Sequence, residues 1–349
     1  GVELRHLRIQ LGLQKLHLVV ERLRLASMLG LDRHTVMYLR EQNEEVVVLD
    51  NLTKGHEQAV LNVPLYKGDL TDGKVIDQIF ADHDIDSVIH FAASSLVGES
   101  VTNPLEYYRN NVAGSQALVS KLVEHEVKYI VFSSTAATYG NPERTPIEEN
   151  DVTNPTNPYG ETKLAIEKML RWCDDAYGLK STSLRYFNAA GADPEGKIGE
   201  DHQPESHLIP IVLQAALGQR EKVSIFGDDY NTKDGTCVRD YIHVLDLAQA
   251  HYLALKKMKE TNESGIYNLG NGKGFTVKEV IDTCRSVTEK PIEAEVAPRR
   301  AGDPATLIAS SSKAMNELGW KPVYPELSQI VAHAWSWHQN HPEGYGDQS

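Results

Sequence analysis

Short apolar runs alternate with amphipathic segments from residue 34 onward. The apolar runs predict strands at 45–50, 64–67, 87–92, 129–133 and 181–186. Between them, apolar residues at helical spacing predict helices at 34–42, 72–80, 104–126 and 158–177. Apolar strands separated by helices are typical of a parallel sheet that is covered on both faces. We therefore predict a doubly wound α/β domain, whose ligands would bind at the carboxyl ends of the strands.

The alternation loosens after Asn188. Turn-rich stretches at 192–204 and 227–235 interrupt it, and no internal repeat appears. We expect residues 34–187 to form the main domain, with return segments around 236–270. Residues 188–349 would then form a smaller lobe.

The first thirty-three residues differ in composition from the rest of the chain. They contain ten leucines and carry a net charge of +3, whereas the remainder is strongly acidic. Leucines at mixed three- and four-residue spacing from Leu4 to Leu16 suit an amphipathic helix. The alternation Leu23-Arg24-Leu25 suits a short strand instead. The segment has no uninterrupted apolar core, which argues against a signal peptide.

Length and composition narrow the class of protein. The chain has 349 residues, of which 41% are hydrophobic and 24% charged, so a globular protein of about two lobes is expected. A net charge of −14 disfavours binding of nucleic acid or of an anionic membrane, and no apolar run is long enough to span a bilayer. Three widely spaced cysteines indicate a reducing, cytoplasmic compartment and exclude a disulfide framework and a Cys-only zinc site. We expect no metal.

A tyrosine and a lysine four residues apart are the first candidates for chemistry. Tyr159 and Lys163 fall on the predicted helix at 158–177, and this spacing puts both side chains on one face. An ammonium group near a phenol lowers the pKa of the phenol and yields a general base that works near neutral pH. Because such a pair alone is more often a surface contact, the neighbouring motifs decide its meaning.

Polar residues at three predicted strand ends strengthen this interpretation. Ser133 and Thr135 close one strand, Asp50 ends another and Asp69 follows a third. An acid at Asp50 would accept both ribose hydroxyls of an adenosine and repel a 2′-phosphate, which favours NAD over NADP. Asp69 would meet the adenine amino group. Each residue alone also fits a turn or a cap, but together they describe NAD lying across the sheet beside a Tyr/Lys/hydroxyl triad.

Ordered motifs continue this pattern along the chain. They include His90-Phe-Ala-Ala93, Phe132-Ser-Ser-Thr-Ala-Ala-Thr-Tyr-Gly140, Asn157-Pro-Tyr-Gly-Glu-Thr-Lys163, Leu184-Arg-Tyr-Phe-Asn188, Gly235-Thr-Cys-Val-Arg-Asp-Tyr-Ile-His-Val244 and Pro298-Arg-Arg-Ala-Gly-Asp303. In these motifs residues 34–349 resemble the extended short-chain dehydrogenase/reductase family and, within it, the bacterial UDP-glucose 4-epimerases. The resemblance implies a Rossmann-type NAD-binding domain, a substrate-binding lobe and a homodimer that pairs the helices at 104–126 and 158–177.

The resemblance also implies roles for single residues. Tyr159 would take the 4-hydroxyl proton of a UDP-hexose, Lys163 would hold the nicotinamide ribose, and Thr135 would bridge the sugar and Tyr159. NAD would further be lined by Asp50, Asn51, Asp69, Leu70, Phe91, Ala92, Ala93, Asn110, Ser133 and Tyr186. The uridine diphosphate would be held by Asn188, Leu208, Phe226, Arg239, Arg300 and Asp303. The implied reaction interconverts UDP-glucose and UDP-galactose through a transient 4-keto sugar.

The segment before residue 34 departs from the family. There the family has a strand and a Gly-rich turn, whose three glycines would fall on Ala26, Leu29 and Asp32. A side chain at Leu29 would block close approach of the backbone to a pyrophosphate, and a carboxylate at Asp32 would repel it. We therefore expect residues 1–33 to be an altered segment that lacks the first, central strand of the sheet and weakens NAD binding.

Other positions bear on the kind of sugar that is accepted and on two alternative functions, a dehydratase and a binding protein. Ser95 stands where some epimerases have a lysine, and Leu307 borders the expected sugar pocket, where a bulky side chain is associated with plain hexoses. A dehydratase needs an acid/base pair after Thr135, but Ala136 and Ala137 cannot exchange protons. A binding protein without catalysis is the other alternative. The altered Gly-rich turn supports it and the retained triad opposes it.

Overall fold

Seven parallel strands form the main sheet of the protein, for which a computed structural model describes residues 16–20, 31–52, 62–91, 93–201, 205–300 and 303–346. Their spatial order is β11 (Gly265–Leu269), β6 (Lys180–Tyr186), β5 (Tyr129–Ser133), β4 (Ile85–His90), β1 (Leu16–Val20), β2 (Glu45–Asp50) and β3 (Leu65–Lys67). The direction of winding reverses between β1 and β4, which places a ligand crevice at the carboxyl ends of these strands. The predicted Rossmann-type fold class is confirmed.

The central strand comes from the leucine-rich segment. Leu16–Val20 pairs with β2 on one side and with β4 on the other, so that Val19 lies in register with Val48 and Ile89. The expectation that the sheet lacks its first strand is therefore wrong. Residues 21–30 separate this strand from the next helix. The alternatives of a helix before Leu16 and a strand at 23–25 lie outside the described residues.

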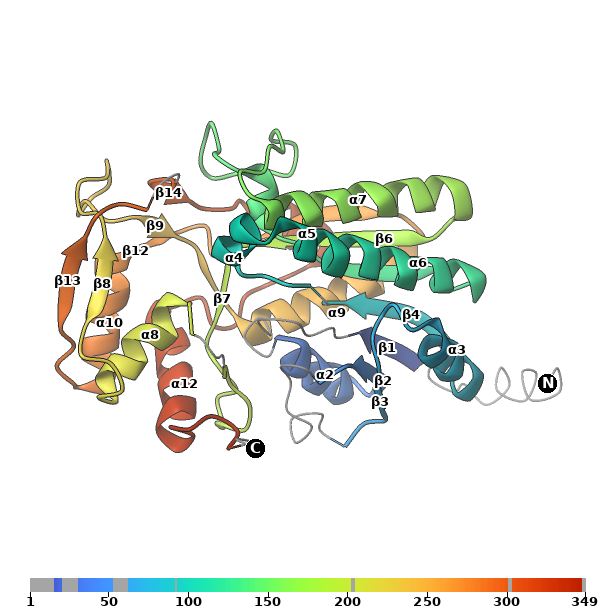
Figure 1. Ribbon diagram of the computed structural model, residues 1–349, viewed down its shortest axis with the longest axis horizontal. Coiled ribbons are helices and arrows are strands. Elements are labelled where there is room, and N and C mark those ends of the chain that lie inside the picture. The colour runs from blue at the N-terminus through green and yellow to red at the C-terminus, as the bar shows by residue number, and fades with distance from the viewer. Residues whose placement is uncertain are drawn as a thin grey trace.

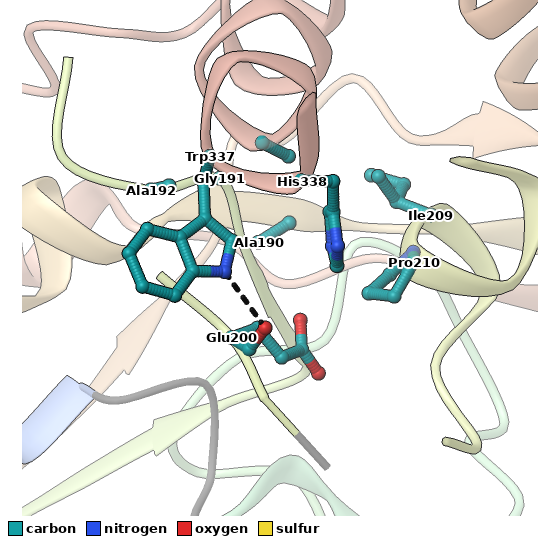
Figure 2. Close-up of a pocket in the computed structure, with 9 residues that line it drawn as sticks. Ala190, Gly191, Ala192, Glu200, Ile209, Pro210, Trp337 and His338 are labelled. Carbon is teal, nitrogen blue, oxygen red and sulfur yellow. Dashed lines mark hydrogen bonds between the residues drawn. The ribbon is translucent and has the colours of Figure 1, made fainter. Parts of the chain in front are cut away.

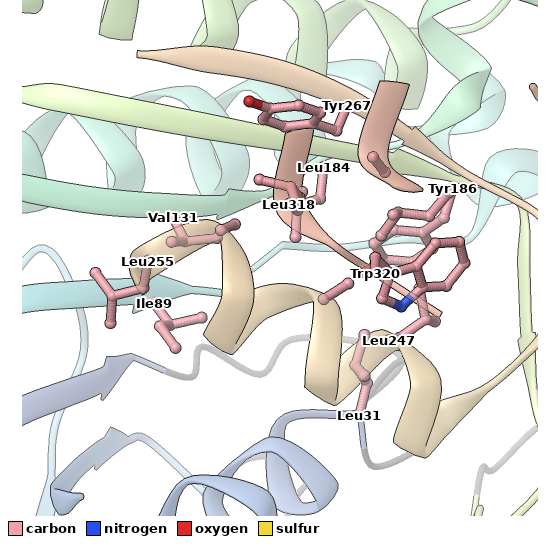
Figure 3. Packing of buried hydrophobic residues seen from close by; sticks show 14 of the residues in the cluster. Leu31, Ile89, Val131, Leu184, Tyr186, Leu247, Leu255, Tyr267, Leu318 and Trp320 are labelled. Atoms are coloured by element: carbon pink, nitrogen blue, oxygen red, sulfur yellow. The ribbon is translucent and has the colours of Figure 1, made fainter. Parts of the chain in front are cut away.

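Helices cover both faces of the sheet (Figure 1). On one face lie α3 (Gly73–Asp82), α6 (Gly114–Glu124) and α7 (Pro158–Tyr177), and on the other lie α2 (Leu31–Glu41) and α9 (Val244–Thr261). Because side chains alternate along a strand, β2 contributes Val47 and Leu49 to the first core and Val46 and Val48 to the second. Figure 3 shows the second core around Trp320. Two packed faces hold the strand ends in fixed positions.

Local capping explains the boundaries of the predicted helices. The Asp72 side chain accepts from Lys74 N at 3.1 Å and begins α3. Asn157 begins α7 in the same way by accepting from Gly160 N at 2.9 Å. The helix ends where Gly178 adopts a left-handed conformation with φ of 68°. The strands predicted at 45–50 and 129–133 and the helix at 158–177 agree with the structure at both ends.

The predicted helix at 104–126 is divided into three parts. It consists of α5 (Pro104–Tyr107), a π-helical segment (Tyr108–Ala113) and α6. A short helix that we did not predict, α4 (Val97–Thr102), precedes it. The π-helical segment packs against α7, and it carries Asn110 and Asn111 into the interior. Such segments often occur at functional sites.

The second lobe packs against the carboxyl end of the sheet (Figure 1). Its core lies between the helices α8 (Leu208–Ala216), α10 (Val277–Thr288) and α12 (Leu327–Asn340) and the strand pair β8 (Val223–Phe226) and β13 (Ala294–Ala297). Two small sheets connect the lobes: β7 (Asn188–Ala190) with β10 (Tyr241–His243), and β9 (Val238–Arg239) between β12 (Phe275–Thr276) and β14 (Thr306–Leu307). No helix in the described ranges has both the length and the apolar character to cross a bilayer.

Candidate active site

Thr135, Tyr159 and Lys163 come together at the carboxyl end of β5. Thr135 begins the 3₁₀ turn Ala136–Tyr139, where its hydroxyl accepts from Ala137 N at 3.1 Å. Tyr159 and Lys163 lie in the first two turns of α7 and are only 4% and 1% exposed. The Thr135 hydroxyl makes a hydrogen bond with Tyr159, and Lys163 Nζ donates to the Ser133 carbonyl oxygen at 2.8 Å. The three side chains thus share one buried site.

Glycine at position 160 permits this arrangement. A Cβ on Gly160 would lie 2.6 Å from the carbonyl oxygen of Ala137. The start of α7 therefore packs directly on the 3₁₀ turn that follows Thr135. This close approach brings Tyr159 next to the Thr135 hydroxyl.

Burial dominates the acid–base properties of the site. It raises the pKa of Tyr159 to about 12, and the hydrogen bond with Thr135 opposes the rise. It lowers the pKa of Lys163 to about 7, and the Glu167 carboxylate one turn further along α7 opposes the fall. The expected lowering of the Tyr159 pKa is not seen in this structure, because burial sets the direction of the shift. The Lys163 ammonium group donates to the Ser133 carbonyl oxygen.

Residues predicted to bind adenosine lie at the carboxyl ends of β2 and β3. Asp50 is 1% exposed, and its Oδ1 accepts from Leu52 N at 2.8 Å. Asn51 Nδ2 lies 3.5 Å from Asp69 Oδ2, and Asp69 Oδ1 accepts from Thr71 N at 2.9 Å. Carboxylates and an amide therefore line this part of the sheet edge, as recognition of a ribose requires.

The next predicted positions differ in their exposure. Phe91 follows β4 and contacts His251, with ring centroids 4.8 Å apart. Leu70 is 1% exposed within the core, so only its backbone is available to a ligand. Ala93 is partly buried beyond Phe91. Ala92 lies outside the described residues.

Asn110 belongs to a buried network that ties the loop after β4 to α7. Asn110 Nδ2 donates to Ser94 Oγ at 2.9 Å, and Asn111 Oδ1 accepts from Ser94 N at 2.7 Å. Asn111 Nδ2 also donates to Thr162 Oγ1 at 3.0 Å. Ser94, Asn111 and Thr162 were not singled out from the sequence, because nothing in their spacing marks a contact between distant segments.

Tyr186 and Ser133 meet beside Lys163. Their hydroxyl groups are hydrogen-bonded at the carboxyl ends of β6 and β5, and burial raises the pKa of Tyr186. Both residues are at most 2% exposed. They form a polar wall at the carboxyl ends of β5 and β6, where the Tyr186 ring belongs to the core that α9 covers.

Four of the predicted diphosphate-binding residues gather in two pairs in the second lobe. The Arg300 guanidinium stacks on the Phe226 ring, 3.9 Å from its centroid. Arg239 forms an ion pair with Asp303. Two arginines beside an aromatic ring suit a nucleoside diphosphate, because guanidinium groups bind phosphate in bidentate fashion.

The remaining substrate residues connect this cluster to the triad. Asn188 Nδ2 donates to the Asp240 carbonyl oxygen at 3.0 Å and opens β7, and Leu208 begins α8. Leu307 on β14 lies in register with Arg239 on β9. It also packs against the small core that includes Ala136. Leu307 is therefore placed between the arginine cluster and the turn that carries Thr135.

The beginning of α2 contains an acid where the family has glycine. Asp32 lies in the first turn, is 7% exposed and accepts from Arg33 N at 2.7 Å. The carboxylate thus accepts from one backbone N–H at the positive end of this helix, which Rossmann domains otherwise offer to a pyrophosphate. Ala26 and Leu29 lie outside the described residues.

A buried charged network beneath the triad was missed by the sequence analysis. Glu167 accepts from Arg185 Nε at 2.9 Å and from Ser134 Oγ at 2.5 Å. Arg185 Nη1 also donates to the Tyr139 hydroxyl at 2.9 Å, and that hydroxyl donates to Asn268 Oδ1 at 2.7 Å. The spacing of Tyr159, Lys163 and Glu167, four residues each, was the available signal for Glu167. The network joins β5, β6, β11 and α7 under the site.

Comparison with known proteins agrees with this geometry. Residues 28–270 match the NAD dependent epimerase/dehydratase family. The chain is 66% identical over 316 residues to a UDP-glucose 4-epimerase of Halalkalibacterium halodurans, covering 90% of this chain and 95% of the relative. A solved UDP-glucose 4-epimerase shares 53% identity with a TM-score of 0.91 and covers 95% of this chain and 100% of its own. The Brucella ovis enzyme, solved in complex with NAD, shares 43% identity with a TM-score of 0.88 over 92% and 97% of the chains. The chain therefore belongs to the NAD dependent epimerase/dehydratase family.

Proposed function

We propose that this protein interconverts UDP-glucose and UDP-galactose by inverting C4 of the sugar. One observation carries the proposal: Leu307, in register with Arg239, packs against the small core of the turn that follows Thr135, and so links the catalytic group to arginines suited to a nucleoside diphosphate. The relatives named UDP-glucose 4-epimerase cover nearly the full length of the described sheet and lobe. Interconversion is an isomerisation and consumes no cofactor overall.

The residues present fit both ends of the NAD molecule, the adenosine and the nicotinamide. The buried Asp50 at the end of β2 suits the adenosine ribose, and its negative charge would repel the 2′-phosphate of NADP. Ser133, Lys163 and Tyr186 form the polar wall expected beside a nicotinamide ribose. When bound, NAD supplies the acceptor and donor of a hydride. Asp32 disfavours binding of the pyrophosphate, the middle part of NAD, because its carboxylate lies at the helix end that a pyrophosphate would use.

Tyr159 is the proposed general base. Its hydroxyl makes a hydrogen bond with Thr135, which would pass the proton of the sugar 4-hydroxyl to the phenolate. Because burial raises the pKa of Tyr159 to about 12, the phenol needs positive charge nearby before it can act. Lys163 is placed to provide it, with its ammonium fixed on the Ser133 carbonyl oxygen.

The second lobe would hold the part of the substrate that does not react. Arg239, Arg300 and Phe226 would bind the uridine diphosphate, and Asp303 would orient Arg239. If the binding energy resides in the nucleotide, a 4-keto sugar can turn about its link to the diphosphate without leaving the site. Bound NAD would supply the hydride for the opposite face of C4, and Tyr159 would return the proton to the sugar oxygen.

The sugar pocket favours a plain hexose and epimerisation. The side chain of Leu307 is packed against the core around Ala136, which leaves less room for an N-acetyl group. Ala136 and Ala137 follow Thr135 in the turn and have no acid or base for the elimination of water. A dehydratase function is therefore disfavoured.

We further propose that the protein is a homodimer. Apolar side chains project from α4, α5 and α7, with exposed fractions of 60% for Val101, 82% for Leu105 and 64% for Trp172. These helices lie side by side on one face of the sheet (Figure 1). An exposed apolar surface of this kind is typical of a protein interface, and a second copy of the same face would cover it.

The free cysteines Cys173, Cys237 and Cys284 support a cytoplasmic location.

The Tyr159→Phe variant tests the proposed function. Loss of the phenolic oxygen should reduce the conversion of UDP-galactose to UDP-glucose by roughly 10²–10⁴-fold, the usual contribution of a general base. Binding of UDP should change little, because the arginine cluster is untouched. Undiminished turnover in the variant would show that Tyr159 is not the base.

A further inference from the structure

Asp240 lies where the two small sheets that connect the lobes meet. It follows Arg239 of β9 and precedes Tyr241 of β10. Arg239 lies in register with Leu307 of β14. Tyr241 lies in register with Asn188 of β7. Asp240 therefore stands between the strand of the proposed diphosphate-binding arginine and the strand pair that includes Asn188.

The Asp240 carboxylate is completely buried among backbone N–H groups. Its Oδ1 accepts from Asn271 N at 2.7 Å. Its Oδ2 accepts from Gly272 N at 3.3 Å and from Ala309 N at 3.2 Å. Within the described ranges it forms no ion pair, and burial raises its pKa to about 6 although these N–H groups oppose the rise. A buried carboxylate without a cation is costly, and here three N–H groups that only an acceptor can satisfy offset the cost.

The loop after β11 is fixed against this carboxylate. A Cβ on Gly270 would lie 2.3 Å from Asp240 Oδ2, so the backbone and the carboxylate are in close contact. Ser311 Oγ accepts from Gly270 N at 2.6 Å and donates to the Gly270 carbonyl oxygen at 2.7 Å. The carboxylate is thus enclosed by segments from β11 and β14 and has little freedom to rotate.

The backbone of Asp240 in turn fixes the start of β7. Its carbonyl oxygen accepts from Asn188 N at 3.3 Å and from Asn188 Nδ2 at 3.0 Å. The other end of β7 packs against α12, where Ala190 and Gly191 line a small cavity together with Trp337 (Figure 2). Any shift of Asp240 would therefore move Asn188 relative to the rest of the strand.

Asp246 provides a matched comparison. It is also buried, at 1% exposed, and burial raises its pKa to about 6. Its carboxylate likewise accepts from backbone N–H groups, those of Val323 at 2.6 Å and of Tyr324 at 3.0 Å. These contacts fix the segment before α12, which contains none of the residues proposed to bind substrate or NAD. Asp246 thus shares the burial and bonding of Asp240 but not its neighbours.

We propose that Asp240 is a positioning residue for the nucleotide part of the substrate. Its carboxylate fixes the chain between β9 and β10, and this holds Arg239 on one side and Asn188 on the other in the geometry that a nucleoside diphosphate requires. The inference rests on the proposed function, in which Arg239 and Asn188 bind the uridine diphosphate. It assigns Asp240 no contact with the substrate.

The experiment is a calorimetric titration of the full chain with UDP. An amide at position 240 turns one carboxylate oxygen into a donor, which then faces at least one backbone N–H. We expect Asp240→Asn to weaken UDP binding by roughly 10–100-fold, because displacing a binding group by about 1 Å can cost that much. Asp246→Asn should lower the thermal midpoint as well but leave UDP binding unchanged. Equal UDP affinities of the two variants would overturn the proposal.

Steady-state kinetics with UDP-galactose separate positioning from general loss of structure. Asp240→Asn should raise KM and leave kcat close to the wild-type value, since the reacting groups are untouched. If this variant fails to fold by circular dichroism, Ser311→Ala decides. That variant should weaken UDP binding by roughly 2–10-fold, the equivalent of one lost hydrogen bond, and wild-type affinity would contradict the proposal.

The titration also distinguishes this inference from the proposed function. A wild-type protein that binds UDP but does not convert UDP-galactose would refute the epimerase function, whereas the affinities of the variants would still test Asp240. A wild-type protein that does not bind UDP would overturn both.

Discussion

Removal of the buried Glu167 carboxylate should destabilise the whole domain. Its side chain and that of Arg185 are both 4% exposed. Glu167 accepts hydrogen bonds from Arg185 Nε at 2.9 Å, from Arg185 Nη2 at 2.5 Å and from Ser134 Oγ at 2.5 Å. Glutamine keeps the shape of the side chain but not the charge. The Glu167→Gln variant therefore leaves the Arg185 guanidinium as a buried charge without its carboxylate.

The magnitude follows from the burial of both groups. Removing one partner of a buried ion pair typically costs about 3–5 kcal/mol. With an unfolding entropy of about 2.1 cal/mol/K per residue, a chain of this length loses roughly 4–7 °C of thermal midpoint for that cost. Turnover should also fall, because Ser134 precedes Thr135 and because Glu167 opposes the loss of charge on Lys163.

Thermal unfolding by circular dichroism measures the effect. The matched control is Glu161→Gln, the same substitution at an exposed position of the first turn of α7. The control should unfold within about 1 °C of the wild-type protein, since exposed charges contribute little to stability. Equal midpoints for Glu167→Gln and Glu161→Gln would refute the argument that this ion pair stabilises the sheet.

Three further predictions concern the cofactor, pH and assembly. Asp32→Asn should strengthen NAD binding by about 5–150-fold, which is equivalent to roughly 1–3 kcal/mol of relieved charge repulsion. In the same NAD titration, the control variant Glu41→Gln, at the exposed far end of α2, should bind NAD like the wild-type protein. His243 and His251, whose pKa values burial lowers to about 2 and about 4, bind protons only when the chain unfolds. Stability should therefore fall by about 1.4 kcal/mol per pH unit for each of them as pH drops from 6.5 toward 4, and His251→Gln should flatten the denaturant-derived profile. Leu105→Lys should convert the dimer to a monomer in sedimentation experiments at micromolar concentration, and a wild-type monomer there would contradict the proposed interface.

The fold could be predicted because its determinants are local. Apolar runs and cap residues such as Asp72 and Asn157 mark elements within a few residues of themselves. The strand Leu16–Val20 was missed because a short apolar run does not distinguish a strand from a helix. Its assignment depends on pairing with β2 and β4, which are far away in the sequence.

The candidate site was predictable where its residues share a helix or end a strand. Tyr159 and Lys163 are related by helical spacing, and the arginines were found through motifs. Spacing could not reveal the contact of Arg185 with Glu167, because it joins two elements that meet only in the folded chain. The direction of the Tyr159 pKa was also misjudged, since residue identity does not report burial.

Isotope transfer tests the central claim most directly. UDP-galactose carrying deuterium at C4 of the sugar is incubated with the protein and NAD in ordinary water, and the product is analysed by mass spectrometry and NMR. The account predicts UDP-glucose that keeps its deuterium at C4, because the hydride leaves and returns to the same carbon while Tyr159 handles only the oxygen-bound proton. Loss of the deuterium to solvent, or a dehydrated 4-keto product, would contradict it.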